Sequence, residues 1–569
     1  MDFPKLAELL LPDVKTTPLD WIKKYPARNL PAGALVTRLC PSPTGFLHVG
    51  ALYMGLLDKR IASDSKGVSI LRIEDTDEAR EVSGAKELII KGLEQYCLTP
   101  DEGPGKGDYG PYVQSARKDI YASYAKDLVK RGLAYPCFMT PDELTAMRKE
   151  QEIAKVRPGY YGKYAKWRGA SIEQINERLA AGATYCIRFR SNGDQNKKQS
   201  FKDEFLGDLQ VPENDEDFII MKTGGGTTYH LAHVVDDFLM RANFIIRGEE
   251  WLSSVPKHLD LWRAFDLEVP LYGHVMPINK QDGSSVRKIS KRKDPEANFE
   301  MYSKTGYPED AIIGYLYRLA NPSFDDWWQD PKNLKNKNLS VNDFPFSIDE
   351  LKRGGRGPLL DIKKLDSISG DIIAKMSGDV VSQKMISWAE INDIEFAKIA
   401  KNNFGYFKQI LSIEREVENP RKDIVSWSQG VSFVNYFFEE YFDSKKAKEI
   451  LVADLVDENR LSTVLKDLIQ TLSDDSYYTE PSLDVWVENI KKLANMLGFA
   501  VDRKAYKEAP DKFKGDFALF MKTIRVGVTG RDKTPNLFYV LKVLGKERVI
   551  SRLKRVAPQS TVRDVISQN

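Results

Sequence analysis

Hydrophobic residues near the start of the chain follow first a strand-like and then a helix-like pattern. Residues 34–39 (ALVTRL) form an apolar run of the kind found in buried strands. A turn rich in Pro, Ser, Thr and Gly follows at 41–45, apolar residues then recur at helical spacing from about His48, and Gly67 is expected to end that helix. Residues 68–73 (VSILRI) predict the next strand. These segments make a βαβ unit, the building block of a parallel sheet.

The pattern changes several times farther along the chain. Five prolines interrupt residues 1–34, which breaks any long element there. Residues 126–222 mix helical periods with short strands such as 186–190, and we interpret them as an insertion. The α/β pattern returns over 223–275, whereas helical periodicity dominates beyond residue 300.

We therefore predict a multidomain chain made of an α/β half and an all-α half. The α/β half would hold a parallel-sheet catalytic domain of the Rossmann type, interrupted by an inserted α+β domain. The predicted parts are an N-terminal extension (1–34), the Rossmann-type domain (35–125 and 223–275), the insertion (126–222), a region with a Lys-rich loop (276–370) and a helical region (371–569).

Composition narrows the class of protein. The chain has 569 residues, 42% hydrophobic and 29% charged, which is typical of a globular protein with about three to five domains. Its apolar runs are too short to cross a membrane. Its first residues lack the basic start and apolar stretch of a secretory signal, so we expect a cytoplasmic location without membrane attachment.

Cysteines and charge point to no particular ligand by themselves. The four cysteines are far apart and have neither the pattern of a disulfide framework nor the spacing of zinc ligands, so free thiols are expected. The formal net charge is only +2, but residues 522–569 carry eleven Lys and Arg against three Asp and Glu. Such a basic end suits a phosphate backbone, although a solvated helix surface is the simpler explanation.

The strand-to-helix junction at 41–50 (PSPTGFLHVG) is the first candidate site. A helix N-terminus presents N–H groups without intrahelical partners and the positive end of the helix dipole, which together suit an anion. His48 can donate a hydrogen bond to a phosphate oxygen, and Gly50 lets a flat ring or a phosphate approach the backbone. Taken alone, the same residues fit a Pro/Gly turn with a capping histidine.

Residues 288–293 (KISKRK) form the second candidate site. Four cations and one hydroxyl, placed after a Gly-containing turn at 282–284, suit a triphosphate and the charge that moves onto a leaving pyrophosphate. A basic loop that stood alone would usually be a solvated surface. We expect the two candidate segments, although far apart in sequence, to converge on one nucleotide.

The pair resembles the "HIGH" and "KMSKS" signatures of class I aminoacyl-tRNA synthetases, here HVGA at 48–51 and KISKR at 288–292. Ala51 replaces the last histidine of the first signature, so any phosphate contact of that residue must come from elsewhere. More of the chain is similar to one branch, the glutamyl-tRNA synthetases. The matching stretches are TRLCPSPTG (37–45), LRIEDTD (71–77), DEGP (101–104), YHLAHVVDD (229–237) and IRGEEW (246–251), with weaker matches at 529–530 and 544–548.

The resemblance implies roles for residues that bind glutamate. In the family, arginines hold the carboxylates, an acid receives the α-ammonium and polar groups complete the pocket. The matching residues here are Arg38 and Arg247 for the carboxylates, Glu74 for the ammonium, and Ser42, Tyr229 and His233 for the rest of the pocket. The family often has asparagine where this chain has His233, although an imidazole can also donate a hydrogen bond.

The resemblance also implies ATP as a substrate. His48 and Lys291 match the residues that stabilise the transition state at the phosphates. The implied ATP-binding residues are His48, Gly50, Glu250, Trp251, Lys288, Ser290 and Lys291. Mg2+ would accompany ATP, bound mainly through its phosphates. No metal site within the protein is expected: only Cys137 lies near the place where some family members bind zinc.

The implied function is ATP-dependent ligation of L-glutamate to tRNA(Glu) through a glutamyl-adenylate, performed by a monomer. The insertion would hold the acceptor end of tRNA, and the helical region would reach the anticodon. Two related alternatives stay open: an enzyme that also charges tRNA(Gln), and a glutaminyl-tRNA synthetase, although Ser42 and Thr44 stand where that branch has acidic and different turn residues. A nucleotidyltransferase without tRNA, or a catalytically silent tRNA-binding protein, fits less well.

Overall fold

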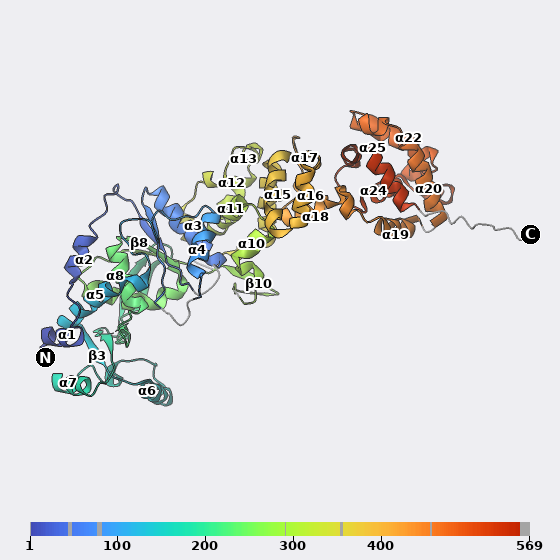
Figure 1. The fold of residues 1–569 in the computed structure, drawn as a ribbon. Helices are drawn as coiled ribbons and strands as arrows, with labels where there is room; N and C mark the ends of the chain where they lie inside the picture. Colours follow the sequence, from blue (N-terminus) through green and yellow to red (C-terminus); the bar gives the residue numbers. More distant parts are fainter. Residues whose placement is uncertain are drawn as a thin grey trace, which may run out of the picture. The chain divides into compact units, whose positions relative to one another are not determined.

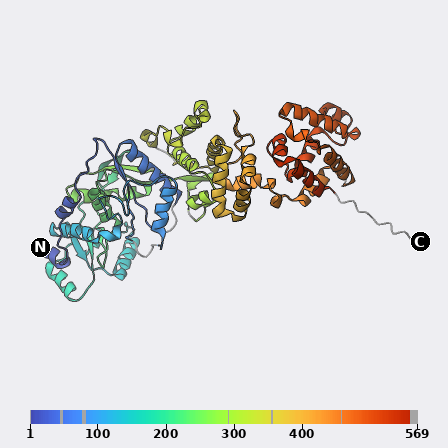
Figure 2. The ribbon, with the colours of Figure 1, turned by 45° about the horizontal axis from the view of Figure 1, so that its top comes forward.

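The chain folds into two compact units (Figure 1 and Figure 2). Unit 1 consists of Met1–Tyr302 and Glu309–Ile362, and unit 2 of Ser303–Pro308 and Lys363–Asn569. The structure is a computed structural model, and it describes residues 2–43, 48–76, 82–290, 292–352, 357–455 and 458–557. Within these ranges, no helix is long and apolar enough to cross a membrane.

Unit 1 combines helices with short strands. Its helices are α1 (Phe3–Leu10), α2 (Pro18–Lys24), α3 (Val49–Asp64), α4 (Ala85–Gln95), α5 (Lys118–Lys130), α6 (Pro141–Ile153), α7 (Ile172–Ala180), α8 (Tyr229–Leu239), α9 (Val255–Ala264), α10 (Phe299–Thr305), α11 (Glu309–Ala320), α12 (Ser323–Gln329) and α13 (Pro331–Lys335). The last residues of α10, from Ser303 on, already belong to unit 2. Its strands are β1 (Val36–Leu39), β2 (Val68–Leu71), β3 (Ala134–Cys137), β4 (Cys186–Phe189), β5 (Lys198–Asp203), β6 (Gly207–Pro212), β7 (Ile219–Met221), β8 (Phe244–Gly248), β9 (Leu271–Val275), β10 (Asn279–Asp282), β11 (Ser285–Lys288) and β12 (Leu359–Leu360).

Two parallel strand pairs lie at the centre of unit 1. β1 pairs with β2, with Val36 opposite Val68, and β8 pairs with β9, with Phe244 opposite Leu271. β1 also lies beside β8, where the N–H of Asn243 donates to the carbonyl of Val36 at 3.1 Å. Every residue of β1 is buried, as expected for a strand that is covered on both faces. The parallel α/β fold predicted from the sequence is therefore confirmed.

Helix α3 connects β1 to β2 and begins where the sequence predicts. His48 is its N-cap, in extended backbone conformation, and its Nδ1 accepts a hydrogen bond from the N–H of Gly50 at 2.9 Å. The helix ends shortly before Gly67, but Gly67 is not the residue with left-handed backbone conformation. That residue is Lys66, with φ 57°. Gly67 is required by a close approach instead: a Cβ there would lie 1.8 Å from the carbonyl oxygen of Leu35.

Residues 126–222, interpreted as an insertion, contain two small antiparallel sheets. The first has the order β3-β4-β7, and the second is the β5–β6 hairpin. Helix α6 starts with a capping box in which Thr140 and Glu143 each accept a hydrogen bond from the other's backbone N–H. Residue 126 itself lies inside α5, which packs against α1.

The segment before the Lys-rich motif is a β-hairpin. β10 and β11 pair with Asp282 opposite Ser285, and the turn contains Gly283 at φ 60°, which suits a two-residue hairpin loop. β12 adds to the other edge of β10 in parallel. The motif at 288–292 therefore starts on the last residue of β11, so the hairpin fixes where the loop begins.

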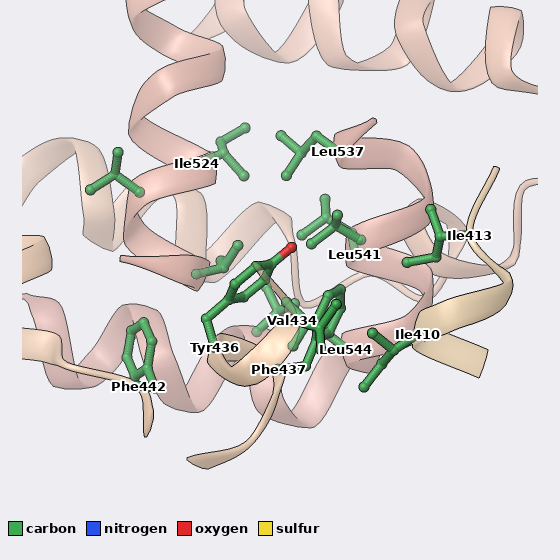
Figure 3. Packing of buried hydrophobic residues seen from close by; sticks show 14 of the residues in the cluster. Ile410, Ile413, Val434, Tyr436, Phe437, Phe442, Ile524, Leu537, Leu541 and Leu544 are labelled. Atoms are coloured by element: carbon green, nitrogen blue, oxygen red, sulfur yellow. The ribbon is translucent and has the colours of Figure 1, made fainter. Parts of the chain in front are cut away.

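The described residues of unit 2 form helices and no strand, as the sequence predicts. The helices are α14 (Ile362–Lys375), α15 (Gly378–Asn392), α16 (Ile394–Asn402), α17 (Phe404–Ser412), α18 (Trp427–Val434), α19 (Ser444–Leu455), α20 (Glu458–Thr471), α21 (Ser476–Thr479), α22 (Leu483–Met496), α23 (Arg503–Glu508), α24 (Phe517–Thr529) and α25 (Leu537–Val556). Figure 3 shows part of their shared core, where Ile410 of α17, Ile524 of α24 and Leu541 of α25 are buried together. Unit 2 thus has a hydrophobic core of its own.

Candidate functional site

A cavity of about 590 Å³ lies at the carboxyl ends of β1, β8 and β9 and along α3. In open parallel sheets, ligands bind at this edge, outside the carboxyl ends of the strands. Most of the residues predicted from the sequence to bind substrates line this cavity. They are Arg38, Ser42, His48, Gly50, Glu74, Tyr229, Arg247, Glu250, Trp251 and Lys288.

The start of α3 presents a hydrogen-bond donor to the cavity. Because Nδ1 of His48 accepts from the N–H of Gly50, a neutral ring carries its proton on Nε2, and that nitrogen is a donor. A Cβ at Gly50 would lie 3.0 Å from Nδ1 of His48, so a larger residue there would disturb the contact. Ala51 also lines the cavity, with a methyl group where the signature has a second imidazole. Together with the helix dipole, this arrangement suits a phosphate.

Buried ion pairs form one side of the cavity. Nε of Arg38 lies 3.2 Å from Oδ2 of Asp237, and Nη1 donates to the carbonyl of Ile246 at 2.9 Å. Arg72 donates to Oδ1 of the same Asp237 at 2.5 Å and to Oε1 of Glu74 at 3.1 Å. Burial raises the pKa of the Glu74 carboxyl, and Arg72 opposes that shift. Glu74 is thus an acid held by a guanidinium at the cavity wall, where it can accept from an ammonium.

Arg247, at the end of β8, is held by two histidines. Its Nε donates to Nε2 of His274 at 2.9 Å, and its Nη1 lies 3.1 Å from Nδ1 of His258. Its contacts with the Tyr229 hydroxyl and the Trp251 carbonyl are longer, at 3.4 Å each. The rings of Tyr229 and Trp251 pack with centroids 4.3 Å apart and form the adjoining wall. In the described part of the chain, no carboxylate forms a salt bridge with Arg247.

His233, predicted to contact glutamate, lies behind the cavity wall rather than on it. Its side chain is fully buried, and its ring stacks behind that of Tyr229 with centroids 5.6 Å apart. Nε2 of His233 lies 3.1 Å from the Tyr272 hydroxyl, and Nδ1 lies 3.1 Å from Oδ2 of Asp237. The position therefore supports Tyr229 and the ion pairs, and it does not face the space where a substrate would bind.

The Lys-rich loop is fixed near its start by one buried aspartate. The two Nη atoms of Arg287 donate to the carboxylate of Asp294 at 2.7 and 2.9 Å, and the N–H of Ser290 donates to it at 2.8 Å. Lys288 lines the cavity, whereas Ser290 does not. Lys291, predicted to be catalytic, lies outside the described residues.

Three charged residues of the site were missed by the sequence analysis. Arg72 and Asp237 form the central ion pair, and the sequence carried a signal for the latter, because Asp236 and Asp237 directly follow the apolar pair Val234 and Val235 in a largely apolar helix. Asp58 of α3 lines the cavity and is 2% exposed, and among the described residues neither of its carboxylate oxygens has a hydrogen-bond partner. Its sequence context, between an apolar run and two basic residues, gave no hint of burial.

Metal ligands do not cluster in the described residues: no group of three or more His, Cys, Asp or Glu side chains could hold an ion. Cys137 and Cys186 lie opposite each other on β3 and β4.

Comparison with known proteins gives matches over nearly the whole chain. The profile described as "tRNA synthetases class I (E and Q), catalytic domain" matches residues 34–326, and that described as "Anticodon binding domain" matches residues 503–557. The chain is 38% identical over 560 residues to a glutamate–tRNA ligase of Clostridium perfringens, covering 98% of this chain and 99% of the relative. It is 39% identical over 562 residues to a glutamate–tRNA ligase of Acetivibrio thermocellus, covering 98% and 100%.

A solved structure gives the same result at lower identity. The crystal structure of a glutamate tRNA ligase from Elizabethkingia meningosepticum, in complex with its amino acid, is similar with a TM-score of 0.70 and 26% identity. The similarity covers 92% of this chain and 99% of that one.

Proposed function

Because the chain belongs to the glutamyl-tRNA synthetase family of class I aminoacyl-tRNA synthetases, and so joins L-glutamate to tRNA at the expense of ATP, we propose that the unit 1 cavity holds both small substrates. One observation carries the proposal: ten residues from sequence segments as far apart as Arg38 and Lys288 line a single cavity. Its volume of about 590 Å³ is within the range of small-ligand sites.

Glutamate has two carboxylates and one ammonium, and the proposed site matches that charge pattern. Arg247 would bind the side-chain carboxylate, since its charge has no carboxylate partner in the described chain, whereas the charge of Arg38 is already paired. Glu74 would receive the α-ammonium. Ser42 and Tyr229 would complete the pocket with hydroxyl groups. Glutamine would bind poorly, because an amide leaves the guanidinium without a counter-ion.

ATP would bind at the start of α3 and along the Lys-rich loop. His48 would donate from Nε2 to a phosphate oxygen, and Gly50 would let the nucleotide approach the helix backbone. Glu250 and Trp251 would lie beside the adenosine. Lys288, Ser290 and Lys291 would follow the triphosphate, with Lys291 stabilising the charge on the leaving pyrophosphate.

The reaction has two steps, and neither needs a protein nucleophile. The α-carboxylate of glutamate attacks the α-phosphorus of ATP, the bond to the β-phosphate oxygen breaks, and pyrophosphate leaves with the electron pair. A ribose hydroxyl of the terminal tRNA adenosine then attacks the acyl carbon of the adenylate, and AMP leaves. Catalysis therefore consists of positioning and charge stabilisation by residues such as His48 and Lys291.

The tRNA contacts are assigned to parts of the chain rather than to single residues. We propose that the insertion at 126–222 holds the acceptor end and that the helical region at about 371–569 reaches the anticodon. The match of residues 503–557 to an anticodon-binding domain supports the second assignment. The basic composition of 522–569 is consistent with a phosphate backbone as its partner.

The metal ions, the oligomeric state and the location of the protein can also be proposed. Mg2+ enters with ATP as part of that substrate, bound mainly by the phosphates. We propose that the protein binds no zinc, acts as a monomer and works in the cytoplasm, where charged tRNA is used. Metal analysis and light scattering of the purified chain test the first two of these statements.

Pyrophosphate exchange with glutamate and with glutamine, each with and without purified tRNA(Glu) and tRNA(Gln), tests the function directly. We expect exchange with glutamate only, and only in the presence of tRNA, since the family usually requires tRNA for the first step. Aminoacylation of both tRNAs in the same preparations shows whether tRNA(Gln) is also charged. Exchange with glutamine but not with glutamate would contradict the proposed substrate, and a tRNA-independent exchange would contradict the tRNA requirement alone.

A further inference from the structure

Three buried histidines, together with the partly buried His230, form a cluster beside the arginine that we assign to the glutamate side chain. His274 is fully buried and His258 is 1% exposed, and both face Arg247 directly. His230 lies 3.1 Å from His258 on the far side, and His233 packs against His258 with ring centroids 4.3 Å apart. Such a concentration of imidazoles behind a binding site needs a physical explanation.

The hydrogen-bond directions in this cluster follow from chemistry. A guanidinium only donates, so Nε2 of His274 and Nδ1 of His258 must both be acceptors. His274 then carries its proton on Nδ1 and donates to Oδ2 of Asp203 at 2.5 Å. His258 carries its proton on Nε2, which lies 3.1 Å from Nδ1 of His230. Every contact is satisfied when the histidines are neutral, so they orient Arg247 without changing its charge.

The chain of contacts ends in the insertion. Asp203 is the last residue of β5, is 1% exposed, and accepts hydrogen bonds from the N–H groups of Phe205, Leu206 and His274. The His274 ring separates it from Arg247, so it fixes the imidazole but does not pair with the guanidinium. Burial lowers the pKa of His258 and of His274, in agreement with neutral rings.

We propose that His258 and His274 are positioning residues that determine amino-acid specificity: they hold Arg247 through neutral acceptors only and so keep its positive charge unpaired for a substrate carboxylate. A carboxylate in either position would orient the arginine equally well, but it would supply the counter-ion itself. The cavity would then no longer demand an anionic side chain, and glutamine would be admitted. This inference rests on the proposed assignment of Arg247 to the glutamate side chain.

The decisive experiment compares His258→Asp with His258→Asn in the full chain with tRNA, by steady-state pyrophosphate exchange with glutamate and with glutamine. Asparagine keeps an acceptor near the Nδ1 position and adds no charge, so we expect its ratio of kcat/KM for glutamate over glutamine to stay within about threefold of the parent. For His258→Asp we expect that ratio to fall by roughly 100-fold or more. The KM for ATP should change little in both. A parental ratio in a folded His258→Asp chain would overturn the inference.

A second pair keeps the test independent of whether His258→Asp folds. His274→Gln retains an acceptor near the Nε2 position, whereas His274→Leu removes it, so only the leucine variant should raise the KM for glutamate, by roughly tenfold or more. Equal effects of the two substitutions would contradict the positioning role.

Arg247→Leu tests the assignment of Arg247 to the glutamate side chain separately from the role of the histidines. If it leaves the selectivity unchanged, the assignment of Arg247 and the inference both fail. If it abolishes selectivity while His258→Asp does not, only the inference fails.

Discussion

Single side chains in the cavity differ in whether their charge is already paired. Asp237 takes contacts from Arg38 and Arg72, and the second of these also holds Glu74. Arg247, by contrast, has neutral imidazoles as its close partners. Because a buried charge without a partner is costly, a site of this kind gains most from a ligand that brings the missing charge. The pairing pattern therefore supports the proposed placement of glutamate more directly than the mere presence of arginines does.

The two ring nitrogens of His48 are expected to have separable roles. His48→Asn keeps a side-chain oxygen that can cap α3 in place of Nδ1, but it lacks the donor at Nε2. We expect the thermal midpoint of unit 1 to stay close to that of the parent, while the pyrophosphate exchange rate falls by roughly 100-fold. His48→Ala, the matched control, should lose the cap as well and be destabilised by about 1 kcal/mol. Normal exchange by the asparagine variant would show that Nε2 does not act on the phosphates.

Asp58 should make the stability of unit 1 depend on pH. Burial raises the pKa of its carboxyl to about 8, whereas an unfolded aspartate titrates near about 3.9. Between these values the folded chain keeps a proton that the unfolded chain has lost, so this group reduces stability as pH rises, by at most about 1.4 kcal/mol per pH unit.

Asp58→Asn removes this dependence. The gain in unfolding free energy relative to the parent should therefore be larger at pH 8 than at pH 5, by roughly 1–3 kcal/mol, as measured by urea denaturation at both values. Asp64→Asn, on the same helix but with a side chain that is 45% exposed, should show a difference below about 0.5 kcal/mol. A gain for Asp58→Asn that is the same at both pH values would contradict the raised pKa.

Elements that line the cavity were predictable where the local sequence carries the geometry. The strand, turn and helix around His48 follow from apolar spacing and from the Pro/Gly turn, and α3 begins one residue after it. Long-range partners were not predictable, because no local pattern indicates that Arg72, directly after β2, forms an ion pair with Asp237 of α8. The same reason hid Asp203, which contacts His274 across more than 70 residues of sequence. Family resemblance supplied residues that line the cavity, and the structure supplied those that hold them.

The hairpin β10–β11 and the loop after it should depend on Asp294. This carboxylate binds Arg287 twice and the N–H of Ser290, and the Arg287 guanidinium lowers its pKa. We expect Asp294→Ala to lower the rate of pyrophosphate exchange by roughly tenfold, because the Lys-rich loop loses its anchor. Arg287 also binds Asp282, whose side chain is 58% exposed. Asp282→Ala is therefore the matched control and should have little effect on the exchange rate. If both variants kept the exchange rate of the parent, this anchor would not be needed.

At the scale of the whole molecule, the described residues of each unit have buried hydrophobic clusters of their own. Leu231 belongs to a buried cluster of unit 1, and Leu465 to the large cluster of unit 2. The chain passes between the units more than once, since Ser303–Pro308 belongs to unit 2. Within unit 2 this segment is held by contacts such as the Trp427 N–H to the Gly306 carbonyl at 2.9 Å. Separate cores favour separate unfolding, even in one continuous chain.

We therefore expect the full chain to unfold in two calorimetric transitions. Leu465→Ala removes a fully buried side chain from unit 2 and should lower only one transition, by roughly 5–10 °C, since such truncations cost about 2–5 kcal/mol. Leu231→Ala, equally buried in unit 1, should lower only the other. Glutamate with ATP should raise the transition that Leu231→Ala lowers, because only the state with an intact unit 1 cavity binds them. A single transition that shifts with both substitutions would mean that the two cores unfold together.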